Sequence, residues 1–408
     1  MTSAPPIDSF VNSRFERECR DAVSELRAAL IDLYDSCGTD PTAPQEAARQ
    51  FGINKTLTWT LARLLQESDL LAAASLVPGR GSITRVATAA ERCGASEASA
   101  SRVRRAAEQF ESMAERHVGD RAALELALDS MGAGSTEALE ISRRLAFRGN
   151  SGIHGVQARA RLLCGFLLPS ADGDRIDLAM LTGYLGFRRL RHTPRWPLFK
   201  VRSWGSPDDP VATQRWQPID GALPNGILPH LGRGFAPELL EHASDDGSEF
   251  LLQPGPIGND GAFDLFRGEI LRDGASRFAS SEPSGDTGEL GANITTPAEN
   301  LVFDLIAHES LEFALDAEAL VYSRIFDQGR ATGSGVSDLL PIQQSTGMLP
   351  GRPPAVATPL VPGYAETLSD VADRIGCDLT ACRGLRLEMR YPPLGSTVTL
   401  RFKLPTRP

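Results

Sequence analysis

Roughly the first 130 residues carry apolar side chains three and four positions apart, which is the spacing of amphipathic helices. From Phe10 to Ser36 this spacing is continuous, charged residues fill the positions between, and Gly38 follows, so we predict one long helix. We therefore expect residues 1–132 to form an all-α domain. Its other predicted helices are a pair within Pro44–Gln66, and then Ser68–Leu76, Thr84–Cys93, Ser96–His117 and Asp120–Met131.

From about residue 155 the pattern changes to short β-prone runs separated by Gly, Pro and Asp. One amphipathic helix is predicted at Tyr364–Ile375. Two segments, 280–298 and 332–363, are rich in Ser, Gly, Thr or Pro, and we expect both to be flexible. The predicted strands are Arg159–Leu168, Leu198–Trp204, Phe250–Gln253, Phe263–Leu271, Leu301–Ala307 and Leu320–Ile325.

The C-terminus has the clearest strand pattern. Apolar and polar residues alternate over Leu385–Tyr391 and again over Val398–Leu404, with Pro-Pro-Leu-Gly between them. Such alternation predicts an amphipathic two-stranded hairpin with one buried face. The expected fold class is therefore α+β: an N-terminal all-α domain, then a domain over residues 133–408 with helices on one side of a mostly antiparallel sheet.

Composition is that of a globular protein, with 41% hydrophobic and 23% charged residues. No apolar run approaches the roughly 18 residues of a membrane span, and residues 1–9 lack the features of a secretory signal. We expect a cytoplasmic protein with reduced cysteines and no membrane contact. No histidine cluster lies near Cys377 and Cys382, the closest cysteine pair, so we expect no metal site and no cofactor.

Charge is distributed unevenly along a chain whose net charge is −10. Residues 141–202 contain twelve Lys or Arg against three acidic residues, whereas residues 236–328 contain nineteen acidic residues against four basic ones. This asymmetry indicates either a basic face for a polyanion or two regions that attract each other. Solvated surface charge with some internal pairing would explain it equally well.

The stretch Pro44–Gln66 has the features of two helices joined by a tight turn. Proline favours the first turn of a helix, Gly52 suits a left-handed residue that ends it, and Asn54 is a good N-cap for a second helix. Ala47 and Ala48 are small enough for a close helix crossing. The buried seam of the second helix is predicted to be Leu57, Leu61 and Leu64, with Leu65 beside it.

With a small residue, then glycine, then an apolar residue across the turn, this stretch resembles the helix-turn-helix of bacterial transcription regulators. The resemblance covers residues 44–66 and implies that the exposed face of the second helix enters the major groove of DNA. One position departs from the motif. Counted from Gly52, the usual apolar residue falls on Thr58, whereas the seam predicted here uses Leu57, which indicates a turn one residue shorter.

The resemblance assigns candidate DNA contacts. The Arg80 side chain, in a Pro-Gly-Arg-Gly turn, would reach the minor groove like a wing tip, and Arg102, Arg104 and Arg105 would contact the backbone if their helix lies alongside. The alternative for each is a solvated surface arginine. Trp59 either contacts a base or packs on the first helix. A homodimer would form through the Phe10–Ser36 helix. The residues expected at double-stranded DNA are Arg49, Lys55, Thr56, Trp59, Thr60, Arg63 and Arg80.

Catalytic motifs are missing from the sequence. It contains no P-loop, no G-x-S-x-G and no H-E-x-x-H, and the His308-Glu309 pair lacks a second histidine, so we assign no catalytic residue. The most suggestive polar run is Arg143–Gly155, and its glycine-rich part at 148–155 is a candidate ligand loop, because glycines let backbone amides approach a ligand. Its candidate ligand-binding residues are Arg148, Asn150, Ser151 and His154. The alternative is a glycine-rich entry loop with solvated arginines.

Two functions remain open from the sequence. The first is a DNA-binding transcriptional regulator whose α+β domain senses a ligand or partner. The second is a non-enzymatic interaction or assembly protein, in which the helical domain binds protein and the unequal charge of residues 141–202 and 236–328 drives association. An enzyme acting through the Asn150–His154 loop is a third and weaker hypothesis.

Overall fold

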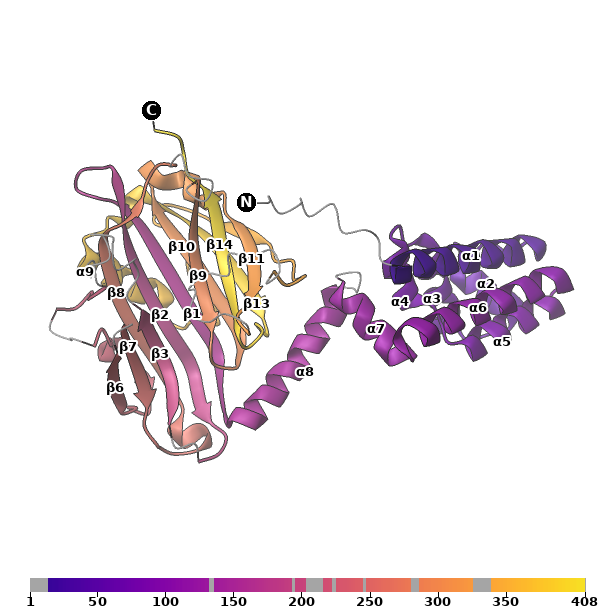
Figure 1. Cartoon of the computed structure of the whole chain (residues 1–408), viewed down its shortest axis with the longest axis horizontal. Helices are drawn as coiled ribbons and strands as arrows, with labels where there is room; N and C mark the ends of the chain where they lie inside the picture. The colour runs from indigo at the N-terminus through magenta and orange to yellow at the C-terminus, as the bar shows by residue number, and fades with distance from the viewer. Residues whose placement is uncertain are drawn as a thin grey trace. The chain divides into compact units, whose positions relative to one another are not determined.

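A computed structural model describes residues 14–131, 136–192, 195–202, 216–221, 225–244, 247–279, 286–325 and 339–407. The chain divides into two compact units, Met1–Leu139 and Glu140–Pro408, here called the helical unit and the sheet unit. Both are drawn in Figure 1. The division falls within α8 (Thr136–His154), so this helix belongs to the sheet unit from Glu140 onward.

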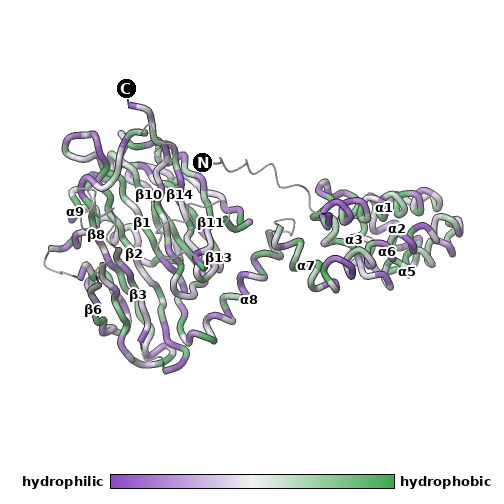
Figure 2. The backbone as a smooth tube through the Cα atoms, viewed as in Figure 1, coloured by the Kyte–Doolittle hydropathy of each residue, from purple (hydrophilic) through white to green (hydrophobic). Residues whose placement is uncertain are grey.

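The helical unit is all-α over its described residues, as predicted. Figure 2 shows purple and green alternating along these helices, the pattern of helices with one exposed and one buried face. α5 begins four residues before the predicted start at Thr84, because Gly79 serves as its N-cap and the glycine run continues into its first turn. The helices before α8 are α1 (Arg14–Ser36), α2 (Pro44–Phe51), α3 (Lys55–Gln66), α4 (Leu70–Leu76), α5 (Arg80–Arg92), α6 (Glu97–Val118) and α7 (Arg121–Ser130).

The apolar face of α1 lies inside the helical unit. Val23, Leu26, Leu30 and Leu33 are fully buried, and the helix packs against α4, α5 and α6. The homodimer expected through Phe10–Ser36 thus has no free apolar face on α1, because this face already forms the core of its own unit. Residues 10–13 of that prediction lie outside the described residues.

The sheet unit is built on one large sheet. Its strands run in the order β12-β13-β10-β1-β2-β8-β4, with β5 also paired to β8. β1 pairs with β10 in parallel, and the other strand pairs described in the three sheets are antiparallel. The strands are β1 (Val156–Pro169), β2 (Arg175–Arg189), β4 (Gln217–Pro218), β5 (Arg233–Gly234), β8 (Phe263–Ser276), β10 (Ala298–His308), β12 (Thr346–Leu349) and β13 (Cys382–Arg390).

Two smaller sheets and one helix complete the unit. One sheet has the order β11-β14-β9 and the other β3-β7-β6. α9 (Tyr364–Ile375) buries Leu368 and Val371 in a core with Leu162 and Phe166 of β1. The expected α+β class is thereby confirmed. The remaining strands are β3 (Trp196–Arg202), β6 (Leu239–Ser244), β7 (Gly247–Leu252), β9 (Thr287–Ile294), β11 (Glu318–Ser323) and β14 (Ser396–Lys403).

The predicted C-terminal hairpin is wrong, because β13 and β14 lie in different sheets. β13 pairs with β10 and β12, whereas β14 pairs with β11 and β9. The two strands face each other across a shared core that buries Leu387 and Leu400. Between them, Tyr391 has a φ of 49° and Pro392 and Pro393 lack N–H donors, so the chain turns out of the first sheet.

The described parts of the two segments expected to be flexible are ordered. Residues 287–294 form β9, and in 339–363 the side chains of Val356 and Val361 are at most 1% exposed. Composition misled the prediction, because an edge strand can contain glycine and a proline-rich loop can still bury its valines. Residues 280–285 and 332–338 lie outside the described residues.

Candidate functional site

The helix-turn-helix is formed by α2, a three-residue turn and α3. Pro44 begins α2, and Gly52 follows its end with a φ of 63°, in the left-handed region. The Asn54 side chain accepts a hydrogen bond from the Thr56 backbone N–H at 2.8 Å, which caps α3. Local sequence alone therefore determines where both helices end and begin.

The register of α3 corrects the predicted seam. Thr58 is 1% exposed and packs inward with Leu61 and Leu64, whereas Leu57 is only half-buried. The Thr58 hydroxyl donates to the Lys55 carbonyl at 2.9 Å, so its polar atom is satisfied within the helix. The turn is therefore not one residue shorter, and the inward position is the one that the motif leads one to expect.

Contacts with α1 hold the motif on the rest of the unit. The Tyr34 and Phe51 rings meet edge to face, with centroids 5.3 Å apart. Arg27 of α1 donates from Nη1 to the Glu67 carbonyl at 2.8 Å and from Nη2 to the Leu65 carbonyl. Because the last carbonyls of a helix have no partner inside it, Arg27 anchors the C-terminal end of α3.

The outer face of α3 carries the predicted contact residues. Lys55, Thr56 and Arg63 are exposed, and Trp59 keeps 51% of its surface exposed instead of packing on α1. Thr60 is half-buried and donates its hydroxyl to the Thr56 carbonyl at 3.0 Å.

Arg49 and Arg80 differ from the other predicted contacts. Arg49 is exposed and lies on α2 instead of α3. Arg80 is the first residue of α5 and no wing tip, since its guanidinium donates to Glu108 at 3.1 Å. The wing is wrong because the glycines around Arg80 continue into a helix and form no hairpin.

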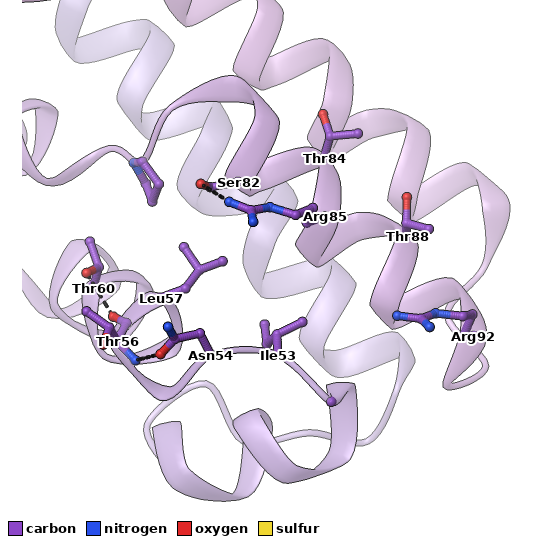
Figure 3. A pocket seen from close by; sticks show the side chains of 12 residues that line it. Ile53, Asn54, Thr56, Leu57, Thr60, Ser82, Thr84, Arg85, Thr88 and Arg92 are labelled. Carbon is purple, nitrogen blue, oxygen red and sulfur yellow. Dashed lines mark hydrogen bonds between the residues drawn. The ribbon is translucent and has the colours of Figure 1, made fainter.

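A groove of about 650 Å³ lies between α3 and α5. Figure 3 shows Asn54, Thr56 and Thr60 on one side and Arg85 and Thr88 on the other. Its α5 side also includes Ser82, whose hydroxyl accepts a hydrogen bond from Arg85 at 2.9 Å, and Arg92. No acidic residue lines the groove. Sequence reasoning missed the α5 side, although Ser82, Arg85, Thr88 and Arg92 follow each other at helical spacing.

Ion pairing separates two groups of cations in the helical unit. Within the described chain, Lys55 and Arg63 of α3 and Arg85 and Arg92 of α5 have no carboxylate within 4 Å. The arginines of α6 contrast with them: Arg102 pairs with Glu25 and Asp32, Arg104 with Glu91, and Arg116 with Glu18.

These pairs lower the pKa values of the carboxyl groups that accept them. Hydrogen bonds from Arg102 and Arg104 lower the pKa of Glu25 and of Glu91, respectively. Two of the three arginines predicted at the DNA backbone, Arg102 and Arg104, therefore act in holding the helices together, while Arg105 is exposed.

The predicted ligand loop at 148–155 is also wrong, because residues up to His154 form the end of α8. Arg148 is exposed, Asn150 half-buried, and Ser151 3% exposed with an unpartnered hydroxyl. The His154 ring lies 5.5 Å from the Trp196 ring. Gly149 and Gly152 have helical neighbours on both sides, so their flexibility is not used to make a loop, and the four residues do not converge on one cavity.

Some arginines of the basic segment 141–202 are buried inside the sheet unit. Arg161 is 9% exposed and its guanidinium lies 4.5 Å from the centre of the Tyr184 ring, and Arg189 is 2% exposed. The unequal charge of residues 141–202 and 236–328 is therefore not entirely a surface property.

The described residues contain neither a cluster of metal ligands nor a helix that could span a membrane. There, no three His, Cys, Asp or Glu side chains come together as a metal site, and Cys377 Sγ and Cys382 Sγ lie 3.6 Å apart as free thiols. No helix within the described ranges is long and apolar enough to cross a bilayer.

Comparison with known proteins gives no family for the chain. No protein-family model matches it, and no curated protein is significantly similar to it.

Proposed function

We propose that the protein is a DNA-binding transcriptional regulator that binds duplex DNA with α3 and α5 of its helical unit. The observation that carries this proposal is the separation of its cations. Arg102, Arg104 and Arg116 on α6 are ion-paired, while cations on α3 and α5 lack a carboxylate partner in the described chain: Lys55, Arg63, Arg85 and Arg92. Unpaired cations beside a groove without acidic residues favour a polyanion.

The two helices would contribute differently. The exposed face of α3, with Thr56 and Trp59, has the size and chemistry to enter the major groove and contact base edges. Lys55 and Arg63 of α3 and Arg85 and Arg92 of α5 offer donors for phosphate oxygens. Because phosphate contacts dominate affinity and base contacts give sequence preference, the cations of both helices would supply binding strength, and the uncharged exposed side chains of α3 selectivity.

The sheet unit would be the sensing part of the regulator, taking up a ligand or a partner. A cytoplasmic location belongs to the same proposal, since the thiols described are free and a DNA-binding protein works where the chromosome is. A dimer through α1 is not part of this proposal, because the apolar face of α1 is buried within its own unit.

The experiment is fluorescence anisotropy of a mixed-sequence duplex with the full-length protein at low salt. Arg85→Ala and Lys55→Ala should each weaken binding by about fivefold to tenfold, since each removes one phosphate contact. Arg116→Ala is the matched control, because Arg116 is equally cationic but pairs with Glu18. Equal losses in all three variants, or no binding by the wild type, would contradict the proposal.

A second candidate is self-assembly, favoured by an exposed apolar stripe on α8. Ile141, Leu145 and Ile153 are 55%, 61% and 67% exposed and lie on one side of the helix with Gly149. In an antiparallel pair with a second copy, Ile141 would face Ile153 and Leu145 would fit over Gly149, so the stripe is complementary to itself.

Light scattering tests this second candidate. The wild type should form a dimer at micromolar concentration, and Leu145→Ser should shift it to monomer. A wild type that is monomeric at every concentration tested excludes it.

A further inference from the structure

The inner face of α8 covers a small closed cavity in the sheet unit. The helix rests on the turn between β13 and β14: the Arg390 Nη1 and Glu140 Oε1 atoms are 2.7 Å apart, and the rings of Phe147 and Tyr391 are 5.6 Å apart. Beneath this contact is a cavity of about 40 Å³. Its walls include Arg143, Phe147 and Asn150 of α8 and Pro297, Pro392 and Leu394 of the sheet unit.

Arg143 is buried there with two of its three nitrogen atoms unpartnered. It is 9% exposed, and its Nε and Nη1 atoms are inaccessible to solvent and make no hydrogen bond within the described chain. Glu140, the nearest acidic side chain on α8, is bonded to Arg390 and is not within 4 Å of Arg143. A buried cation of this kind is strongly destabilising unless another group satisfies its charge and its N–H donors.

Loss of a proton cannot remove this buried charge. Burial lowers the pKa of Arg143, but a guanidinium remains charged at any ordinary pH. The prolines of the wall provide neither N–H groups nor charge, and the Asn150 amide adds further donors. Arg143 and Asn150 therefore bring charge and donor groups to a cavity whose other lining residues are apolar, and no acidic side chain lines it.

The size of the cavity limits what can occupy it. One water molecule needs about 10–15 Å³ of such space, so 40 Å³ accommodates a group of about three heavy atoms. A water molecule could satisfy the N–H donors but would leave the charge compensated only by Glu140, which Arg143 shares with Arg390. A monoanion of one to three heavy atoms would satisfy both, whereas phosphate or a sugar acid is too large.

We propose that this cavity is a binding site for a small monoanion, of the size of chloride or formate, held by the Arg143 guanidinium and the Asn150 amide. The bound anion neutralises Arg143 and thereby stabilises the packing of α8 against the β13–β14 turn. Anion binding in this cavity involves neither DNA nor the groove of the helical unit. This proposal can therefore be tested independently of the proposed function.

The first test is thermal unfolding of the full-length protein at constant ionic strength, with sodium chloride replacing sodium gluconate. Gluconate is too large for the cavity, so the wild-type melting temperature should rise by roughly 2–4 °C for each tenfold increase of chloride above half-saturation. Arg143→Met should abolish this rise. Arg148→Met, which removes an exposed arginine from the same helix, should retain it. The same rise in Arg143→Met as in wild type, or none in wild type, overturns the proposal.

A second measurement needs no variant. Bromide can replace chloride in a crystal of the wild-type protein, and its anomalous signal marks its position. A peak within hydrogen-bond distance of Arg143 Nε or Nη1 supports the site. An empty cavity, or one that holds only water, overturns the proposal even if Arg143→Met fails to fold.

Discussion

Thr58 and Leu57 determine which residues of α3 face outward. A threonine at the inward position is acceptable because its hydroxyl bonds to the Lys55 carbonyl, so no buried polar atom is left unsatisfied. Sequence reasoning preferred Leu57 because it is more apolar, and therefore placed the seam one residue away. It still identified the exposed set correctly at Lys55, Thr56 and Arg63, since these are polar in either register.

At the residue scale, substitution of Trp59 distinguishes an effect on DNA binding from an effect on protein stability. We expect Trp59→Ala to lower the free energy of unfolding by less than truncation of a fully buried side chain does, because Trp59 is 51% exposed, yet to weaken duplex binding severalfold. Urea denaturation followed by circular dichroism, alongside anisotropy, measures both effects.

Leu61→Ala is the contrasting variant. Leu61 is fully buried between the helices, so its truncation should cost about 2–5 kcal/mol of stability. A Trp59→Ala protein as destabilised as Leu61→Ala would show that the tryptophan belongs to the core.

At the scale of elements, the sequence predicted the helices better than the sheets. Each helix is decided by local periodicity and caps, as with Asn54 at the start of α3. Sheet partners are decided by residues far apart in the chain. The alternation in β13 and β14 correctly predicted strands, but nothing in it reveals that Arg386 pairs with Asp304 of β10 in the interior while β14 crosses to another sheet.

The groove between α3 and α5 also depends on residues far apart in the chain. Its α5 side went unnoticed because Arg85 and Arg92 lie outside the motif, and only the packing of α5 brings them opposite α3. The glycines that suggested a ligand loop at 148–155 instead lie in α8, where helical neighbours on both sides outweigh their low helix propensity.

The turn of the helix-turn-helix gives a prediction of its own. Gly52→Ala should destabilise the helical unit by about 1 kcal/mol, because a φ of 63° is costly for alanine although nothing lies within 4 Å of the added Cβ. Gly81→Ala is the matched control in α5. Its Cβ also meets nothing within 4 Å, but its backbone is helical, so the change should be neutral or stabilising. Thermal unfolding of both variants measures the difference, and equal effects would contradict the left-handed turn.

At the scale of the whole molecule, acidic pH should destabilise the helical unit through its ion pairs. Hydrogen bonds from His117 and Arg14 lower the pKa of Glu18 to about 2 from 4.5. A carboxyl group whose pKa is lower in the folded state stabilises it above pH 4.5, and this contribution disappears as the pH falls toward 2.

Glu18→Gln tests this pH dependence. The variant should be less stable than wild type at pH 7, and the difference should shrink between pH 5 and pH 2. Urea midpoints across this range measure it, with Glu46→Gln, an exposed site on α2, as the control. A constant difference at all pH values would show that Glu18 does not act through its charge.

The central claim is that unpaired cations on α3 and α5 bind DNA phosphates, and its most direct test is the salt dependence of duplex binding. The logarithm of the binding constant of the full-length protein should fall linearly with the logarithm of salt concentration, with a slope of about −0.9 for each phosphate contact. Replacing Lys55, Arg63 and Arg85 by alanine together should reduce the magnitude of that slope by about 3, and Arg116→Ala should leave it unchanged. An unchanged slope in the triple variant, or no measurable binding at low salt, would contradict the account.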